Sequence, residues 1–310
     1  MRAGAHDVTL TNLNKVFFPA TGATKGDLLQ YYADVAPFLV PYLAGRAEVM
    51  KRYPGGAEAE FFYMKRTPAN APKWLKTCSI EHGSGSVIAF PIIDDLASLL
   101  WVINLGCIDL NEWYSRCDDT DRPDYLHFDL DPMKDGSTPF ATVRAVALLV
   151  REALDHLGIP AYAKTSGSSG IHVYVPIDRG PRQKEVWTFA KAFAQMMARM
   201  HPDIITAEYV VAKRPSGRVL VDYNQNAWGR TLASVYSVRA KPRATVSTPV
   251  TWDEVEAGIE IEDFRLDNVR ERFVRVGDLW APMQAKTARV DLARFIEPAP
   301  AKARARKKKA

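Results

Sequence analysis

Cysteine is scarce in this sequence, and long apolar runs are missing. The 310 residues include three cysteines, Cys78, Cys107 and Cys117, whose spacing is not that of metal ligands. Their odd number argues against a framework of disulfides, so we expect a reducing environment. No apolar run approaches the roughly 20 residues needed to cross a bilayer, and the N-terminus lacks the order of charged, apolar and small residues that marks a signal peptide. These absences predict a cytoplasmic protein without membrane contact.

A basic excess spread along the whole chain is also missing. The formal net charge is +5, and without the six lysines and arginines after Pro300 it would be −1. The sequence pI of about 9.0 therefore does not indicate that the rest of the chain binds nucleic acid. We expect residues 301–310 to form a disordered basic tail that either holds nucleic acid non-specifically or is only solvated. Residues 1–300 contain no linker long enough to separate two units, so we expect a single domain there.

Helix and strand patterns alternate along the chain. Thr24 precedes an amphipathic helix, over residues 24–44, that Pro37 bends or interrupts. Thr138 is the expected N-cap of a later helix, with Pro139 at its first position and Gly158 beyond its end. Further elements are helices at 96–105 and 184–200, strands on both sides of the Pro54-Gly55-Gly56 turn within 47–66, and strands at 87–91, 125–132, 161–165, 171–176 and 218–222. This alternation predicts an α/β or α+β protein with a sheet core.

The segment Tyr125–Pro132 predicts a buried strand with two carboxylates on one face. Side chains two apart on a strand share a face, so Asp129 and Asp131 point the same way while Phe128 and Leu130 point the other way. Two neighbouring carboxylates repel unless a cation lies between them, and all-oxygen ligands suit Mg²⁺ or Mn²⁺ better than zinc. The alternative is a strand end whose carboxylates point into water. The pair alone does not decide between the two.

A loop of glycine and serine, Ser166-Gly167-Ser168-Ser169-Gly170, connects two expected strands. Glycines let backbone N–H groups approach phosphate oxygens, and serine hydroxyls add donors. His172, in the second strand, would donate to a triphosphate or to a developing negative charge. The alternative is a flexible hairpin loop with a packed histidine, and for this motif alone that alternative is favoured.

A third carboxylate stands at the end of another apolar strand. Asp222 follows Val219-Leu220-Val221, in the way that Asp131 ends the strand of Asp129. It would complete a metal site of three carboxylates, or it is an acidic strand end that starts a turn.

Taken in order, these motifs resemble those of the archaeo-eukaryotic primase superfamily, most closely the polymerase domain of bacterial ligase D. The resemblance rests on Asp129-Leu130-Asp131-Pro132, on the loop that ends at His172, and on Val221-Asp222-Tyr223. It extends over most of the chain, through Leu10-Thr11-Asn12, Lys51-Arg52-Tyr53-Pro54, Glu60-Phe61-Phe62, Tyr236-Ser237-Val238-Arg239 and Trp252-Asp253-Glu254. The Lys-x-Asp-Gly motif of ligases is missing, because Lys134-Asp135-Gly136 is one residue short. The chain therefore looks like a stand-alone unit of the ligase-C-associated branch called Prim-PolC.

The resemblance implies an α+β primase-polymerase fold over residues 1–300. An RRM-like catalytic sheet, flanked by helices, would pack against a second, β-rich N-terminal half. Asp129, Asp131 and Asp222 would hold two Mn²⁺ or Mg²⁺ ions at the catalytic centre. The implied nucleotide and triphosphate site comprises Lys51, Arg52, Ser166, Gly167, Ser169, His172 and Arg239. The implied pocket for a DNA 5′-phosphate comprises Asn12, Lys15 and Lys25, and the implied template contacts are Phe61, Phe62 and Lys65. For Lys25 the alternative is a solvated residue at a helix start.

Two positions depart from ligase D domains. Ser169 stands where these domains usually have lysine, and Asn111-Glu112 stands where they often have His-Pro. Loss of the lysine removes a point charge from the implied triphosphate pocket, so we expect the affinity for nucleotide, or its placement, to differ.

These features predict a template-directed, DNA-dependent nucleotidyltransferase that uses NTP or dNTP. By resemblance it would prefer ribonucleotides and manganese, and would fill short gaps or extend broken ends in DNA repair. Its partners would be double-stranded DNA with a 5′-phosphate and a separate ATP-dependent ligase of the ligase C type; it would act as a monomer, near the nucleoid. Two other functions fit the motifs: a non-catalytic module that bridges DNA ends through their 5′-phosphates, and a metal-dependent phosphoesterase. Intact Asp129, Asp131 and Asp222 count against the bridging module.

Overall fold

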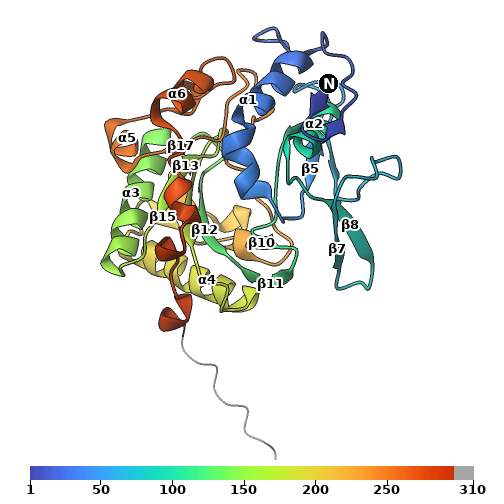
Figure 1. Cartoon of the computed structure of the whole chain (residues 1–310). Coiled ribbons are helices and arrows are strands. Elements are labelled where there is room, and N and C mark those ends of the chain that lie inside the picture. Colours follow the sequence, from blue (N-terminus) through green and yellow to red (C-terminus); the bar gives the residue numbers. More distant parts are fainter. Residues whose placement is uncertain (297–310) are drawn as a thin grey trace, which may run out of the picture.

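Strand β12 (Tyr125–Pro132) is the central strand of the main sheet (Figure 1). It pairs antiparallel with β14 (Ile171–Pro176) on one side and with β16 (Val219–Asp222) on the other. The outer strands are β13 (Tyr162–Thr165) and β17 (Pro249–Val250) beyond β14, and β15 (Ile205–Thr206), which runs parallel to β16. The computed structural model describes residues 1–296, and the six strands lie in the order β15-β16-β12-β14-β13-β17.

Helices α3 (Phe140–His156) and α4 (Gln183–Met200) pack on one face of this sheet. In α3 the buried residues recur at helical spacing: Val143, Val146, Ala147, Val150 and Leu154. Phe128 points from β12 toward these helices, and its ring centroid lies 4.7 Å from that of Phe193 in α4. Because side chains alternate along a strand, Asp129 and Asp131 point to the opposite face. The face opposite α3 and α4 therefore carries the acidic pair.

The N-terminal half is built on α1 (Lys25–Leu43) and a three-stranded sheet. Thr24 caps α1: its hydroxyl accepts from the Asp27 N–H, and the Asp27 carboxylate accepts from the Thr24 N–H. The helix continues through Pro37 to Leu43. The sheet consists of β6 (Phe62–Met64), β5 (Met50–Arg52) and β9 (Cys107–Asp109) in that order, and α2 (Leu96–Asn104) packs against α1.

Four small two-stranded sheets complete the strands of the described chain. They are β1 (Arg2–Ala3) with β2 (His6–Asp7), β3 (Val16–Phe18) with β4 (Ala23–Thr24), β7 (Thr77–Glu81) with β8 (Val87–Pro91), and β10 (Ser115–Arg116) with β11 (Asp119–Pro123). The β7–β8 hairpin projects at the side of the molecule away from α3 (Figure 1).

Short helices lie between and after the last strands of the main sheet. They are α5 (Trp252–Ala257), α6 (Val269–Val276) and the 3₁₀ turns η1 (Val211–Lys213), η2 (Asn224–Asn226), η3 (Ile261–Asp263), η4 (Ala281–Gln284), η5 (Lys286–Ala288) and η6 (Leu292–Phe295). One apolar core runs from Ala3 to Leu292 and takes residues from both halves, and a smaller cluster around Phe90 and Trp113 lies under the β7–β8 hairpin. Within residues 1–296 every helix is too short or too polar to cross a bilayer.

A buried ion pair joins the two halves at the start of β12. The Arg46 guanidinium lies 2.7 Å from the Asp124 carboxylate, and that of Arg116 lies 2.8 Å from it. Burial alone would raise the pKa of Asp124, but the two guanidiniums outweigh burial and lower it. The carboxylate therefore stays ionised and holds the residue just before β12 against the segment that follows α1.

The predicted α+β class is confirmed, while two local expectations are wrong. Pro139, not Thr138, is the N-cap of α3, because the Thr138 hydroxyl instead donates to the Arg218 carbonyl at 3.2 Å. Cys78 and Cys117 form a disulfide, with Cα atoms 5.9 Å apart, which contradicts the expectation drawn from the odd number of cysteines. The predicted basic tail, residues 301–310, lies outside the described residues.

Candidate active site and nucleic-acid interface

Three carboxylates meet on the face of the main sheet opposite α3 and α4. Asp129 lies directly opposite Asp222 in the register between β12 and β16, and Asp131 is two residues further along β12. Repulsion by Asp129 is the largest cause of the raised pKa of Asp131, followed by burial and by Asp222. Burial raises the pKa of Asp129. Burial also raises the pKa of Asp222, and the charge of Asp129 raises it further. An ionised cluster of this kind is costly unless a cation balances it.

The donor set of this cluster fits a hard divalent cation, although the side chains are not assembled around one. Asp129 Oδ1 is a buried acceptor with no hydrogen bond. The Asp222 carboxylate accepts from the Asn224 N–H at 2.7 Å and from the Gln225 amide at 3.0 Å. Within residues 1–296, no three His, Cys, Asp or Glu side chains stand where together they would hold a metal ion.

His172 connects the acidic cluster to a buried lysine. His172 lies opposite Asp129 in the β12–β14 register, with its Nε2 3.2 Å from Asp129 Oδ1. Its Nδ1 lies 2.8 Å from the Nζ of Lys164, a residue of β13. Burial, with the charges of Lys164 and Arg239, lowers the pKa of His172 far below its ordinary value, so the ring is neutral. Sequence reasoning missed Lys164; its signal was a lone charge inside the apolar strand at 161–165.

The serine and glycine loop is closed on itself rather than open to a phosphate. The Ser166 hydroxyl oxygen accepts from the N–H groups of Ser168, Ser169 and Gly170 at 3.1, 3.1 and 2.9 Å. Gly167 has φ = +65°, and a Cβ there would lie 2.7 Å from Arg239 Cγ; a Cβ on Gly170 would lie 2.3 Å from the Leu130 carbonyl oxygen. In this arrangement the three N–H groups are already paired, and the nucleotide-binding role of the loop stays a prediction. The loop's glycines permit close packing instead.

Lys51 and Arg239 converge on Asp109, a carboxylate that sequence reasoning missed. Lys51 Nζ and Arg239 Nε lie 3.3 and 3.5 Å from the same Asp109 oxygen. The Arg239 guanidinium also donates to the Ser166 carbonyl, which places it beside the serine and glycine loop. Burial raises the pKa of Asp129, and the charges of Lys164 and Arg239 oppose that rise, so Arg239 acts on the acidic cluster as well. These two cations, the loop and His172 border the same face of the sheet.

Arg52 points away from Lys51 into a different pocket. Neighbouring residues on a strand face opposite ways, and Lys51 and Arg52 are consecutive in β5. Arg52 lines a pocket of about 240 Å³ whose other residues are Thr11, Asn12, Lys15, Phe17, Lys25, Pro54, Asn104, Leu105 and Gly106. The structure thus brings Asn12, Lys15 and Lys25 together as expected, and it moves Arg52 from the expected triphosphate site to this group.

Lys25 is held inside this pocket and is not a solvated helix-start residue. It is 4% exposed. Its Nζ donates to the Thr11 carbonyl and to Asn104 Oδ1, both at 2.8 Å. Burial lowers the pKa of Lys25, and the charges of Lys15 and Arg52 lower it further. Three cations share one small pocket, and a bound anion would stabilise all of them. Thr11 and Asn104, which orient Lys25, were not found from the sequence.

Aromatic rings line the surface between the two cationic sites. Phe61 and Phe62 are 48% and 46% exposed, which is unusual for large apolar side chains. Lys51 Nζ lies 4.1 Å from the Phe61 ring centroid, and the Arg52 guanidinium lies 5.1 Å from that of Phe62. Lys65, the third expected template contact, is exposed beyond β6. Exposed rings beside cations are typical of surfaces on which nucleic-acid bases stack.

The two residue positions that depart from ligase D have different surroundings. Ser169 is exposed at the tip of the serine and glycine loop. The Asn111 N–H donates to Glu48 Oε1 at 2.6 Å, and the buried Glu112 carboxylate accepts from the Ser234 hydroxyl. Asn111 and Glu112 thus take part in partly buried hydrogen bonds, whereas a lysine at position 169 would reach solvent.

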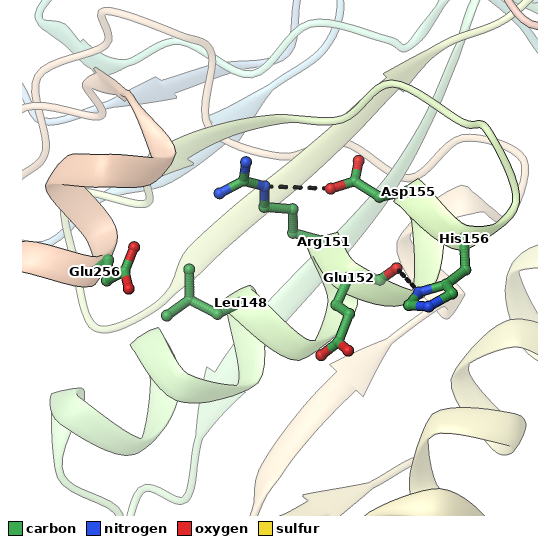
Figure 2. Close-up of a pocket in the computed structure, with 6 residues that line it drawn as sticks. All are labelled: Leu148, Arg151, Glu152, Asp155, His156 and Glu256. Atoms are coloured by element: carbon green, nitrogen blue, oxygen red, sulfur yellow. Dashed lines mark hydrogen bonds and ion pairs between the residues drawn. The ribbon is translucent and has the colours of Figure 1, made fainter.

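A further pocket, of about 420 Å³, lies on the outer side of α3 (Figure 2). It is lined by Leu148, Arg151, Glu152, Asp155, His156 and Glu256. Arg151 pairs with Asp155 at 3.4 Å, and the residues drawn are surface side chains of α3 and α5. Because α3 covers the opposite face of the sheet from Asp129, this pocket is separate from the acidic cluster.

Comparisons with known proteins agree with this arrangement. The family model for LigD, primase-polymerase domain, matches residues 24–280. A multifunctional non-homologous end joining protein LigD of Mycolicibacterium smegmatis is 36% identical over 280 residues, which are 90% of this chain and 36% of that protein. A bifunctional non-homologous end joining protein LigD of Bacillus subtilis is 31% identical over 86% of this chain and 42% of its own length.

A solved structure shows the same fold. The polymerase domain from Mycobacterium tuberculosis ligase D in complex with DNA has a TM-score of 0.83 and 32% identity, and the match covers 89% of this chain and 98% of that one. The chain spans only about a third of the length of the M. smegmatis relative, as the 36% coverage shows. Fold, motif order and match length agree, and the chain belongs to the LigD primase-polymerase domain family.

Proposed function

We propose that this protein is a DNA-dependent nucleotidyltransferase that fills short gaps or extends broken ends during DNA repair. The observation that carries the proposal is the presence of two separate sites, one acidic and one cationic. Asp129, Asp131 and Asp222 form an acidic cluster, and Lys15, Lys25 and Arg52 form a cationic pocket. A polymerase that also senses the strand ahead of it needs both. The names of the relatives, which refer to end joining, support the same role.

The three carboxylates would hold Mn²⁺ or Mg²⁺ ions. Such ions, when bound, supply a lower pKa for the primer 3′-OH and neutralise charge on the triphosphate. The carboxylates provide hard oxygen donors, and Asp129 Oδ1 is the acceptor left without a hydrogen bond. The preference for manganese and for ribonucleotides is part of the proposal and follows the resemblance to ligase D.

Residues around the cluster would orient the nucleotide. Lys51 and Arg239, held in place by Asp109, bring positive charge to the border of the acidic face. The neutral His172 ring adds a hydrogen-bond donor beside Asp129. In-line attack on the α-phosphate forms the new P–O bond and releases pyrophosphate. Positive charges that are already in place stabilise the negative charge that develops in the transition state.

The pocket of Asn12, Lys15, Lys25 and Arg52 would bind the 5′-phosphate on the far side of a gap. Its cations and its volume of about 240 Å³ suit one phosphate group. The partners in this proposal are gapped or broken double-stranded DNA and a separate ATP-dependent ligase of the ligase C type, which would seal the product. The proposed state is a monomer near the nucleoid.

Incubation of the protein with gapped DNA, Mn²⁺ and labelled nucleotide tests the proposal. We expect extension that depends on the template, and tighter binding when the downstream strand carries a 5′-phosphate. Equal binding to phosphorylated and unphosphorylated gaps would remove the gap-filling assignment. Degradation of the DNA would identify a phosphoesterase.

A bridging module for DNA ends is the second candidate. One observation favours it: the cationic pocket of Asn12, Lys15, Lys25 and Arg52 is formed without any of the three carboxylates. In that case the protein would bind 5′-phosphorylated ends without adding nucleotide at any metal concentration.

A further inference from the structure

Lys164 is a fully buried lysine in the interior of the main sheet. Its exposure is 0%, and it lies opposite His172 in the register between β13 and β14. Burying a charged amine is costly unless each of its hydrogens finds an acceptor. None of the roles proposed above uses Lys164. Its contacts therefore show what it does for its neighbours.

The hydrogens of Lys164 can be assigned one by one. An ammonium group has three donors. One points to the Ala233 carbonyl oxygen at 2.8 Å. The second points to the Ser247 hydroxyl oxygen at 2.6 Å, which must accept because the Ser247 hydrogen is used on the Thr165 carbonyl at 2.9 Å. The third points to His172 Nδ1 at 2.8 Å. That nitrogen is therefore an acceptor and carries no hydrogen.

The same assignment fixes the other nitrogen of the ring. A neutral imidazole has a single N–H, so the hydrogen of His172 is on Nε2. Nε2 lies 3.2 Å from Asp129 Oδ1, yet the two are not aligned as a hydrogen bond. The N–H thus faces the acidic cluster and still has a hydrogen to donate to an incoming group.

We propose that Lys164 is a positioning residue for nucleotidyl transfer: it holds His172 in the tautomer whose Nε2–H donates to a phosphate oxygen of the bound nucleoside triphosphate. The inference rests on the proposed function. With the other tautomer, Nε2 would present a lone pair to an anionic substrate and would repel it. A second residue that orients a first one in this way is a common device at sites of group transfer.

Burial lowers the pKa of Lys164 to about 7, and Arg239 acts in the same direction. The carboxylates of Glu112 and Asp129 limit this fall and favour the ammonium form that the role requires. Glu112 is anchored by the Ser234 hydroxyl, next to the Ala233 carbonyl that accepts from Lys164. The charges of two carboxylates, Glu112 and Asp129, thus act on Lys164.

The tautomer can be measured directly in the full-length wild-type protein. Labelling the six histidines with ¹⁵N and removing one signal by His172→Gln assigns the ring nitrogens of His172 in the NMR spectrum. We expect a protonated Nε2 and an unprotonated Nδ1. A hydrogen on Nδ1 would mean that a neutral Lys164 accepts from it, and that result would overturn the inference. The measurement needs no catalysis, so it stands even if the protein adds no nucleotide and the proposed function fails.

A double-mutant cycle separates positioning from a structural role. We expect Lys164→Met to lower kcat/KM for nucleotide on gapped DNA by about ten- to a hundred-fold, the usual effect of losing a hydrogen bond to a charged group. In a His172→Ala background the same change should cost nothing further, because Lys164 acts through the imidazole. An equal loss in both backgrounds would show that Lys164 only supports the fold.

Lys184→Met is the matched control, since it makes the same chemical change on the exposed surface of α4. It should leave kcat/KM and the His172 signals unchanged. If Lys164→Met does not fold, the tautomer of the wild-type protein decides the question alone.

Discussion

Lys51 and Arg52 are neighbours in the sequence but line two different sites. They are consecutive in β5, and they line different sites because a strand points successive side chains to opposite faces. The resemblance placed both in the triphosphate pocket, although the strand period already argued against this. Lys51 contacts Asp109, whereas Arg52 lines the pocket of Lys25. This correction leads to a pair of substitutions with opposite effects.

Arg52→Ala should weaken binding of gapped DNA with a 5′-phosphate by roughly 10- to 100-fold, because a charge-assisted hydrogen bond to phosphate is worth about 1.5–3 kcal/mol. The KM for nucleotide should stay near the wild-type value. Lys51→Ala, the matched variant, should raise the KM and keep the discrimination between phosphorylated and unphosphorylated gaps. Titration of labelled DNA and steady-state kinetics measure the two effects. A raised KM in Arg52→Ala with unchanged DNA binding would return Arg52 to the triphosphate site.

Asp131→Asn should stabilise the metal-free protein at alkaline pH. Repulsion by Asp129, then burial and Asp222, raises the pKa of Asp131 to about 8, so the folded state binds more protons at this site than the unfolded state. The free energy of unfolding therefore falls as pH rises from the ordinary carboxyl range to about 8. The variant lacks this loss, so its melting temperature should exceed that of the wild type at pH 8 and match it at pH 4.

Added Mn²⁺ should raise the melting temperature of the wild-type protein at pH 8 and hardly affect Asp131→Asn. Asp203→Asn, at an exposed position, is the control and should follow the wild type. A variant that melts below the wild type at pH 8 without metal would contradict the repulsion.

At the scale of elements, the strong patterns of the sequence were reliable and long-range pairings were not. The strand at 171–176 and the helix that begins after Thr24 have the predicted bounds within a residue or so, since period and capping are local signals. The disulfide of Cys78 and Cys117 joins positions 39 residues apart, which come together only when the β7–β8 hairpin docks. Short-range sequence patterns do not predict this docking.

The same limit explains what was missed at the candidate site. The resemblance identified Asp129, Asp222 and His172, which the structure places on adjacent strands. Asp109 and Lys164 acquire their contacts only through the pairing of β5 with β9 and of β13 with β14. Each looks like an isolated charge in an apolar strand until the partner strand is known.

The serine and glycine loop provides a test at this scale. Ser166→Ala removes the acceptor of three consecutive N–H groups, and leaving them unpaired should lower the free energy of unfolding by about 1–3 kcal/mol. Amide exchange at Ser168, Ser169 and Gly170 should become faster. Ser169→Ala, at the exposed tip, should change neither quantity. Slow exchange in Ser166→Ala would mean that another group holds the loop closed.

At the scale of the whole molecule, the Asp124 carboxylate ties together segments that are distant in sequence. Arg46 and Arg116 lie 2.7 and 2.8 Å from it, and Arg289 lies 3.9 Å away. Asp124→Ala leaves the buried Arg46 without its partner and should lower the free energy of unfolding by about 3–5 kcal/mol at pH 7. Urea unfolding measures this loss.

The pH dependence of this ion pair has a definite sign. The guanidiniums lower the pKa of Asp124 against the effect of burial, so its stabilisation is complete at neutral pH and is lost as pH falls below the ordinary carboxyl range. The difference between wild type and Asp124→Ala should therefore shrink in acid. A difference that stays constant down to pH 2 would assign the effect to packing.

Strand β5 fixes the distance between the nucleotide site and the phosphate pocket. Its residues 51 and 52 belong to the nucleotide side and to the phosphate pocket, and adjacent Cα atoms are about 3.8 Å apart with no hinge between them. Under the proposed function, the site for the incoming nucleotide and the pocket for the 5′-phosphate at the far end of the gap are therefore a constant distance apart. A gap whose length matches this distance occupies both sites at once. In a longer gap the protein must release the far end and add nucleotides. It binds that end again only when synthesis has brought the end within reach of the pocket.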